Sequence, residues 1–195
     1  QTLSGVISGS GAVTKNVGSS TLTLSGSNTY TGATTISTGV VAVAANTALG
    51  DNGSSRSSTT VSSGAVVTVS GGLSGVTEPI TISGTGVSSN GALRNTSGTN
   101  TWSGAITLGA TTEIQVDSAT SLTLSGGISG TNTNLTIDGI GTTTISGAIA
   151  TGSGTLTKSS AGTLTLSAAN TYSGATTVEN SGGGITVSGS GSLGT

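Results

Sequence analysis

The stretch Gly162-Thr-Leu-Thr-Leu-Ser-Ala-Ala-Asn-Thr-Tyr-Ser-Gly-Ala-Thr-Thr-Val178 contains the pattern on which the fold depends. In Leu164-Thr-Leu166, aliphatic and hydroxyl side chains alternate, which is the period of a β-strand with one apolar face. The Asn and Gly that follow are residues that favour turns. The stretch therefore predicts short strands that are separated by tight turns.

The same alternation occurs six more times along the chain. The segments are Leu22-Thr-Leu24, Val67-Thr-Val69, Ile80-Thr-Ile82, Leu122-Thr-Leu124, Leu135-Thr-Ile137 and Ile185-Thr-Val187. We predict that both aliphatic side chains of every segment point into a core, because side chains on a strand alternate between its two faces. The threonines between them are predicted to point outward; they are Thr23, Thr68, Thr81, Thr123, Thr136, Thr165 and Thr186. With weaker strands in between, the pattern indicates about sixteen short strands and no helix.

Internal repeats organise the whole chain. The segment Leu3–Thr35 recurs at Ile145–Thr177, so that Asn28-Thr-Tyr30 returns as Asn170-Thr-Tyr172. A weaker copy lies between them at Asn100-Thr-Trp102. We interpret residues 1–195 as one continuous segment of a longer repeat array, with sub-repeats at about 1–72, 73–144 and 145–195.

The composition excludes several classes of function. Glycine (35), threonine (40) and serine (35) make up more than half of the 195 residues, yet a mean hydropathy of +0.22 and a net charge of −2 argue against disorder. Without cysteine or histidine the chain has no thiolate nucleophile, no Ser-His-Asp triad of the usual kind and no metal bound by Cys or His, so we expect no enzyme, no metal and no cofactor. Four basic residues are too few for a nucleic-acid surface. No apolar run approaches the ~20 residues of a membrane span.

Short strands with turn signals fit a sandwich, a barrel or a solenoid. Self-similarity at several scales favours the solenoid, in which like turns stack on one another. The core residues are medium-sized aliphatics, and the chain has only three aromatic residues, whereas a sandwich core usually includes larger anchors. We therefore predict an all-β parallel β-helix (β-solenoid), whose outward Thr, Ser and Asn side chains bond to their equivalents in the next turn.

A resemblance to a known family supports this prediction. The segments Ser10–Ile36 and Ser153–Val178 share the string Gly-x-x-Thr-Lys, then Thr-Leu-Thr-Leu-Ser, then Asn-Thr-Tyr-x-Gly-Ala-Thr-Thr. This string resembles the autotransporter-associated β-strand repeat, which occurs in the passenger domains of bacterial autotransporters. The resemblance implies a right-handed parallel β-helix and secretion to the cell exterior or the bacterial outer cell surface.

The aromatic residues are the first candidate site. Tyr30, Trp102 and Tyr172 are the only aromatics, and they share one position in the repeat. Exposed rings would stack on a ligand such as a sugar, whereas buried rings would cap the thin core. We favour the second interpretation. The asparagine two residues before each ring is expected to bond its own backbone in the turn.

Charged residues are the second candidate. Glu113 and Asp117 are four residues apart and could share a strand face, where two carboxylates can bind a cation or act as acid and base. We favour two solvated charges near a turn, because no cation lies near them in sequence. Asp138 precedes a glycine and is expected in a turn. Lys15 and Lys158 hold equivalent repeat positions and are expected to be exposed turn residues.

The sequence favours an extracellular structural or adhesive rod without catalysis. One alternative is a fibre subunit that associates end to end through unpaired strand edges. Another is a surface that binds ice or glycans, suggested by the Thr-x-Thr strings at Thr21, Thr155 and Thr163. These strings are not regular on one predicted face of the solenoid, which counts against the second alternative.

Overall fold

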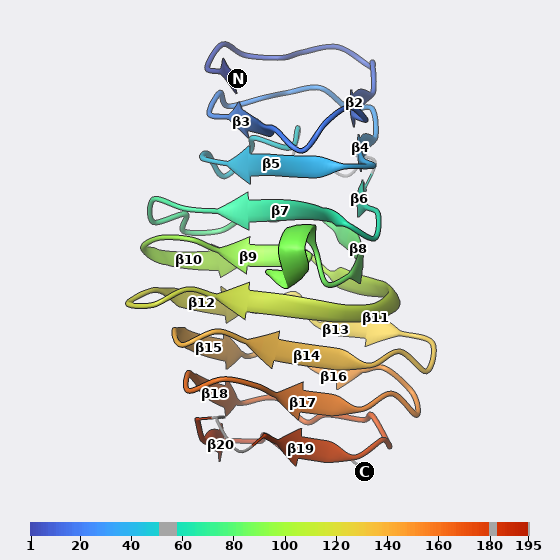
Figure 1. Cartoon of the computed structure of the whole chain (residues 1–195), viewed down its shortest axis with the longest axis vertical. Helices are drawn as coiled ribbons and strands as arrows, with labels where there is room; N and C mark the ends of the chain where they lie inside the picture. The colour runs from blue at the N-terminus through green and yellow to red at the C-terminus, as the bar shows by residue number, and fades with distance from the viewer. Residues whose placement is uncertain (51–57, 180–182, 195) are drawn as a thin grey trace.

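The computed structural model describes residues 1–50, 58–179 and 183–194. Its strands stack as the layers of a rod, with the N-terminus at one end and the C-terminus at the other (Figure 1). Every pairing between described strands is parallel, which confirms the predicted all-β parallel β-solenoid. The right-handed sense of the coil stays a prediction. A single 3-10 turn, η1 (Val87–Ser89), is the one helical element among the described residues, and it is far too short to cross a membrane.

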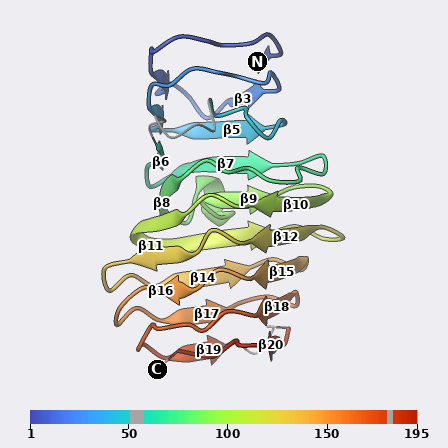
Figure 2. The ribbon, with the colours of Figure 1, turned by 180° about the vertical axis from the view of Figure 1, so that it is seen from behind.

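The strands form three faces, and the chain passes from face 1 to face 2 and then to face 3 in each turn. Face 1 contains β2 (Val13–Lys15), β4 (Thr34–Ile36), β6 (Thr59–Val61), β8 (Ile80–Gly84), the first half of β11 (Ile106–Val116), β13 (Ile128–Gly130) and β16 (Ile149–Ala150). Face 2 contains β1 (Thr2–Leu3), β3 (Thr21–Leu24), β5 (Gly39–Val43), β7 (Ala65–Val69), β9 (Leu93–Asn95), the second half of β11, β14 (Leu135–Asp138), β17 (Leu156–Lys158) and β19 (Thr176–Val178). Face 3 contains β10 (Thr99–Trp102), β12 (Ser121–Leu124), β15 (Thr142–Ile145), β18 (Thr163–Leu166) and β20 (Ile185–Val187), and Figure 2 shows these five strands one above the other. Face 2 has one strand in each layer, so the chain makes about eight turns.

The turns differ in length along the rod. Leu122, Thr143, Leu164 and Ile185 pair in register at equal intervals along the chain, so the turns between them all have the same length. In the middle of the rod, the pairing of Val69 with Asn95 encloses a longer turn. Its additional residues include the excursion around η1, which leaves the strand ladder between β8 and β9. The solenoid thus accommodates insertions between strands while the strand register continues.

The predicted core is confirmed with three exceptions. Eleven of the fourteen aliphatic side chains are buried, and none of the seven threonines between them is. Leu22 and Ile185 are only partly buried but pack against the core. The prediction was wrong for Val187, which is 42% exposed because its strand, β20, has a neighbour on one side alone.

Several inward positions hold polar side chains that the alternation did not predict. Thr143 is buried between Leu122 and Leu164, with which it pairs in register. The long strand β11 belongs to both face 1 and face 2, because its first half pairs with β13 and its second half pairs with β14.

The two strong copies of the repeat lie on different faces. The Thr-Leu-Thr-Leu strand of the first copy, β3, lies on face 2, and the equivalent strand of the second copy, β18, lies on face 3. The following strands are likewise offset, with β4 on face 1 and β19 on face 2. The second copy therefore follows the first after six turns and one additional face. Equivalent residues of the two copies do not stack above one another.

Candidate functional site: the asparagine corners and the threonine faces

Asn28 and Asn170 each connect three successive turns. The Oδ1 atom of Asn28 accepts a hydrogen bond from the Ile7 amide at 2.8 Å, and its Nδ2 atom donates to the Ala48 carbonyl at 2.6 Å. Asn170 repeats this arrangement with the Ile149 amide at 2.8 Å and the Ser192 carbonyl at 2.6 Å. The prediction that these asparagines bond their own turns was wrong, because their partners lie about one turn before and one turn after them.

The tyrosine that follows each asparagine contacts a threonine four residues later and a glycine of the next turn. The Tyr30 hydroxyl lies 2.6 Å from Thr34 Oγ1, and a Cβ atom at Gly50 would lie 3.2 Å from the ring carbon Cε2. Tyr172 has the same contacts with Thr176 and Gly194. Burial raises the pKa of both tyrosines. We call each set of asparagine, tyrosine, threonine and next-turn glycine an asparagine corner; the first set is Asn28, Tyr30, Thr34 and Gly50, and the second is Asn170, Tyr172, Thr176 and Gly194.

The central copy uses the motif differently. The Oδ1 atom of Asn100 accepts hydrogen bonds from the Gly72 and Leu73 amides in the preceding turn, but its Nδ2 atom donates to Ser97 and Asn95 within its own loop. The prediction of a bond within the turn is therefore correct for this copy alone. Trp102 lies in the core, where it pairs with Val76 and Leu124 in the neighbouring turns.

All three aromatic side chains are inside the rod. Tyr30, Trp102 and Tyr172 are 0–1% exposed, so no ring face is open to a sugar or another ligand. Their placement agrees with the interpretation that they fill the thin core. Since these are the only aromatic residues of the chain, stacking on an exposed ring is not a means of ligand binding here.

The paired carboxylates have different environments. Asp117 forms a salt bridge with Arg94 of the preceding turn, with 2.8 Å between Oδ2 and Nη2. The expectation of a solvated charge was therefore wrong for Asp117, because a cation from another turn of the solenoid bonds it. Glu113 is half-buried, and burial together with the charge of Asp138 raises its pKa to about 7. Among the described residues, no group of three metal-ligating side chains is present.

Of the residues predicted in turns, Asp138 lies in a turn as expected, but Lys158 is buried. Asp138 accepts a hydrogen bond from the Gly139 amide at 2.6 Å, as expected for a turn. Lys158 was predicted to be exposed but is 1% exposed, because it occupies an inward position of face 2 between Ile137 and Val178. Its ammonium group donates to the carbonyls of Ser159 and Ser160, which follow it directly in the chain, and burial lowers its pKa. Lys15 is half-buried and bonds carbonyls in the same way.

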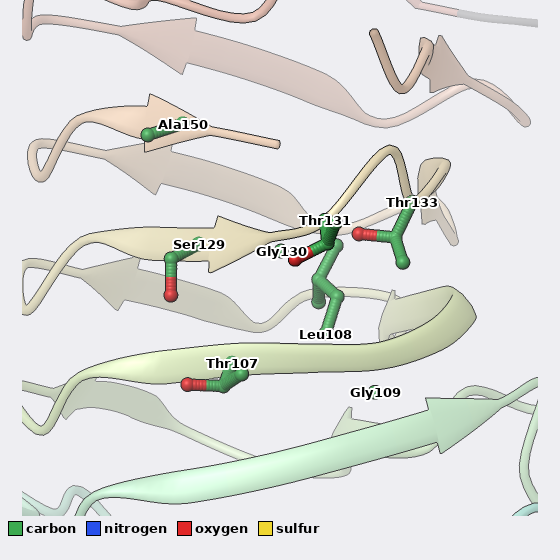
Figure 3. Close-up of a pocket in the computed structure, with 8 residues that line it drawn as sticks. All are labelled: Thr107, Leu108, Gly109, Ser129, Gly130, Thr131, Thr133 and Ala150. Carbon is green, nitrogen blue, oxygen red and sulfur yellow. The ribbon is translucent and has the colours of Figure 1, made fainter. Parts of the chain in front are cut away.

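One hollow of the described surface lies on face 1. It has a volume of about 460 Å³ and is lined by Thr107, Leu108, Gly109, Ser129, Gly130, Thr131, Thr133 and Ala150 (Figure 3). A second hollow, of about 320 Å³, lies beside η1 over face 2. The first lining contains hydroxyl groups but no ionisable side chain, so it offers no acid, base or charged nucleophile for catalysis.

Outward threonines form columns on all three faces, of which the one on face 2 is short and contains Thr136, Thr157 and Thr177. Face 1 has the column Thr14, Thr35, Thr60, Thr81 and Thr107. Face 3 has two columns side by side, which we call the threonine array; they are Thr101, Thr123, Thr144, Thr165 and Thr186, and Thr99, Ser121, Thr142 and Thr163. Of the strings noted in the sequence, only the one at Thr163 belongs to the array. The signal that could have revealed the array is the constant spacing at which Thr123, Thr144 and Thr165 recur in the sequence.

The hydroxyls of the threonine array are open to water. The expectation that they bond their equivalents in the next turn was wrong: within residues 1–50, 58–179 and 183–194, these hydroxyls make no hydrogen bond to another protein group. The parallel ladder is held by backbone hydrogen bonds, so the side-chain oxygens remain available.

Comparison with protein families agrees with this geometry. Residues 17–43 and 156–187 match the model of the passenger-associated transport repeat. The chain carries passenger-associated transport repeats. They are typical of autotransporter passenger domains, which confirms the resemblance inferred from the sequence. Each matched repeat includes one asparagine and its tyrosine, Asn28 and Tyr30 in the first and Asn170 and Tyr172 in the second. No match to the chain was found among curated proteins or among solved structures.

Proposed function

We propose that the chain is a structural and adhesive rod of a bacterial protein that is secreted or displayed at the cell surface. The passenger-associated transport repeats support the location, because such repeats imply transport to the cell surface or exterior. The observation that carries the proposal is the parallel strand ladder, which continues through about eight turns.

The rod predicts resistance to proteolysis. Trypsin cleaves after Lys or Arg, and the chain has four such residues. Lys158 is buried, Lys15 is half-buried, and Arg94 is held by Asp117; Arg56 lies outside the described residues. We expect native protein to resist cleavage at Lys158 and Arg94 in limited digestion followed by mass spectrometry. Rapid cleavage at both sites would contradict a continuous rod.

Adhesion needs a separate test. Beads that carry the full chain should bind a cell layer or a surface coated with environmental polysaccharide more than beads that carry the Leu164→Asp variant. This variant places an unpaired charge in the core beside Thr143 and Ile185 and should disrupt the stack locally. Equal binding by both proteins would show that the folded rod is not the adhesive element.

End-to-end association of rods is a second proposal. The first turn exposes Val6 and Val17, and the last described turn exposes Val178 and Leu193. A further turn of a longer chain or a second copy would cover these side chains equally well. Filaments seen by electron microscopy at rising protein concentration would support association, and a strict monomer in light scattering would exclude it for this segment.

A further inference from the structure

We propose that the threonine array on face 3 binds ice. The array presents Thr-x-Thr or Ser-x-Thr on four consecutive strands, β10, β12, β15 and β18, and a single threonine on β20. Its rows repeat at the strand spacing of about 4.8 Å, and its columns are about 6.6 Å apart because they lie two positions apart along each strand. The outward groups therefore form a lattice with two fixed repeat distances.

The side chains of the threonine array have restricted conformations, and their hydroxyl groups make no hydrogen bond to the described part of the protein. Threonine is branched at Cβ, which restricts its χ1 angle, so its methyl and hydroxyl groups hold fixed positions on a strand. Because the hydroxyls have no protein partner among the described residues, each is free to bond a water molecule. Ordering water on this face consequently costs little side-chain entropy.

The chemistry of the face favours ice over other occupants. No strand of face 3 carries an ionisable side chain, so a charged ligand has no complement there. Protein interfaces depend on aromatic or arginine anchors, and sugar sites depend on exposed rings; the strands of face 3 offer neither, since Trp102 points inward. A neutral lattice of methyl and hydroxyl groups suits a partner that is itself a neutral lattice of hydrogen-bonding groups repeating in two directions, and ice is such a partner.

The turns at this face are also the most regular of the rod. Three successive turns of equal length place β12, β15, β18 and β20 in register without a bulge. On face 1, by contrast, the register shifts between Leu108 and Thr112, and the threonine column gives way to Ser129 and Ala150. An uninterrupted array in constant register is what adsorption to a crystal plane requires.

The test uses the full chain and ice itself. Purified protein is measured for inhibition of ice recrystallisation and for thermal hysteresis, and a fluorescently labelled sample is followed as it adsorbs to a growing single crystal of ice. Three variants are compared: Thr144→Tyr at the centre of the array, Thr136→Tyr on face 2 and Thr107→Tyr on face 1. All three threonines point outward from strands, so the variants differ mainly in the face that they disturb.

We expect the wild-type chain to inhibit recrystallisation and to enter ice, Thr144→Tyr to lose most of this activity, and the two control variants to keep it. Circular dichroism melting curves show whether each variant folds. If Thr144→Tyr does not fold, Thr144→Asn replaces it. Absence of activity in the folded wild-type chain would overturn the proposal, as would loss of activity in Thr107→Tyr or Thr136→Tyr with retention in Thr144→Tyr. Binding to crystalline cellulose or chitin without any effect on ice would overturn it too, while leaving the adhesive rod intact.

Discussion

The two asparagine corners and the central tryptophan turn contain the same motif but use it differently. In both corners the asparagine bonds the turns before and after it, and the tyrosine hydroxyl bonds a threonine four residues later. In the central turn, Asn100 bonds one neighbouring turn and its own loop, and the residue four positions after Trp102 is Ile106. The indole Nε1 of Trp102 has no hydrogen-bond partner in the described part of the chain.

This difference shows that the motif is specified across a turn and not within one segment. The tyrosine ring needs a glycine in the next turn, because a side chain at Gly50 or Gly194 would press against it. The equivalent neighbour of Trp102 is Leu124, which packs with it in the core. The ring, its partner four residues later and the residue in the next turn therefore change together.

The largest expected effect concerns Trp102. Trp102→Ala should lower the free energy of unfolding by about 3–5 kcal/mol, because it leaves a cavity beside Val76 and Leu124. Trp102→Phe should cost clearly less, since the indole N–H that it removes makes no hydrogen bond within the described residues. Urea denaturation followed by circular dichroism measures both. Equal losses for the two variants would contradict the expectation that the cavity, and not the lost indole N–H, determines the cost.

The next effect compares equivalent leucines of the two copies. Leu164→Ala should cost about 2–5 kcal/mol, because this side chain is fully buried on face 3. Leu22→Ala, at the same repeat position on face 2, should cost less since Leu22 is only partly buried. Thr165→Ala is the control and should change stability by about 0.5 kcal/mol at most, as is usual for surface substitutions. A greater loss for Leu22→Ala than for Leu164→Ala would reverse the comparison.

The third effect distinguishes the two corners from each other. Tyr30→Phe removes the partner of Thr34, which is buried, and should cost about 1–3 kcal/mol. Tyr172→Phe should cost about 0.5–1.5 kcal/mol, because Thr176 is less buried and also donates to the Leu193 carbonyl. Thermal melts of both variants measure the difference. Identical losses would mean that the burial of the threonine is unimportant.

The smallest effect is the pH dependence of stability that Glu113 causes in the middle of the rod. The pKa of Glu113 is raised from 4.5 to about 7 in the folded chain, so the folded state binds this proton more tightly than the unfolded state does. The carboxyl therefore favours folding below about pH 4.5, and this contribution is lost as the pH rises through about 7.

Glu113→Gln removes this pH-dependent contribution. Between pH 4.5 and pH 8 the wild type should therefore lose roughly 1 kcal/mol of stability that the variant keeps, a value reduced by solvent screening at this half-buried site. Melting temperatures of wild type and variant across this pH range provide the measurement. Thr165→Ala, which removes no ionisable group, is the control and should not change the profile. A wild-type profile that Glu113→Gln leaves unaltered would contradict the assignment.

Strand alternation predicted most of the fold because it depends on local sequence. The aliphatic-Thr-aliphatic segments identified the inward positions. Leu22 and Ile185 are only partly buried, and the prediction was wrong for Val187, where no further described strand covers the side chain. The polar inward residues could not be predicted in this way. Lys158 reads as a surface residue, and its burial depends on carbonyls that only the folded turn brings to its ammonium group.

The functional surfaces were harder to predict because they form between turns. The bond partners of Asn28 are 21 residues before it and 20 residues after it, and the partner of Asp117 is 23 residues away. The threonine array likewise requires the register of successive turns, and turn length varies along face 2. Repeat detection located the motifs correctly, but it did not show that equivalent copies lie on different faces.

The offset of one face between the two copies bears on how such rods change length in evolution. Each copy takes its contacts from its own strands and from the backbone of the adjacent turns, so it makes the same asparagine bonds whether its first strand lies on face 2 or on face 3. Unequal recombination between repeats then need not insert or delete whole turns, because the same repeat packs in two placements that differ by one face. A gene built from such units can lengthen or shorten in small steps, and each step rotates the downstream surface about the axis of the rod by one face.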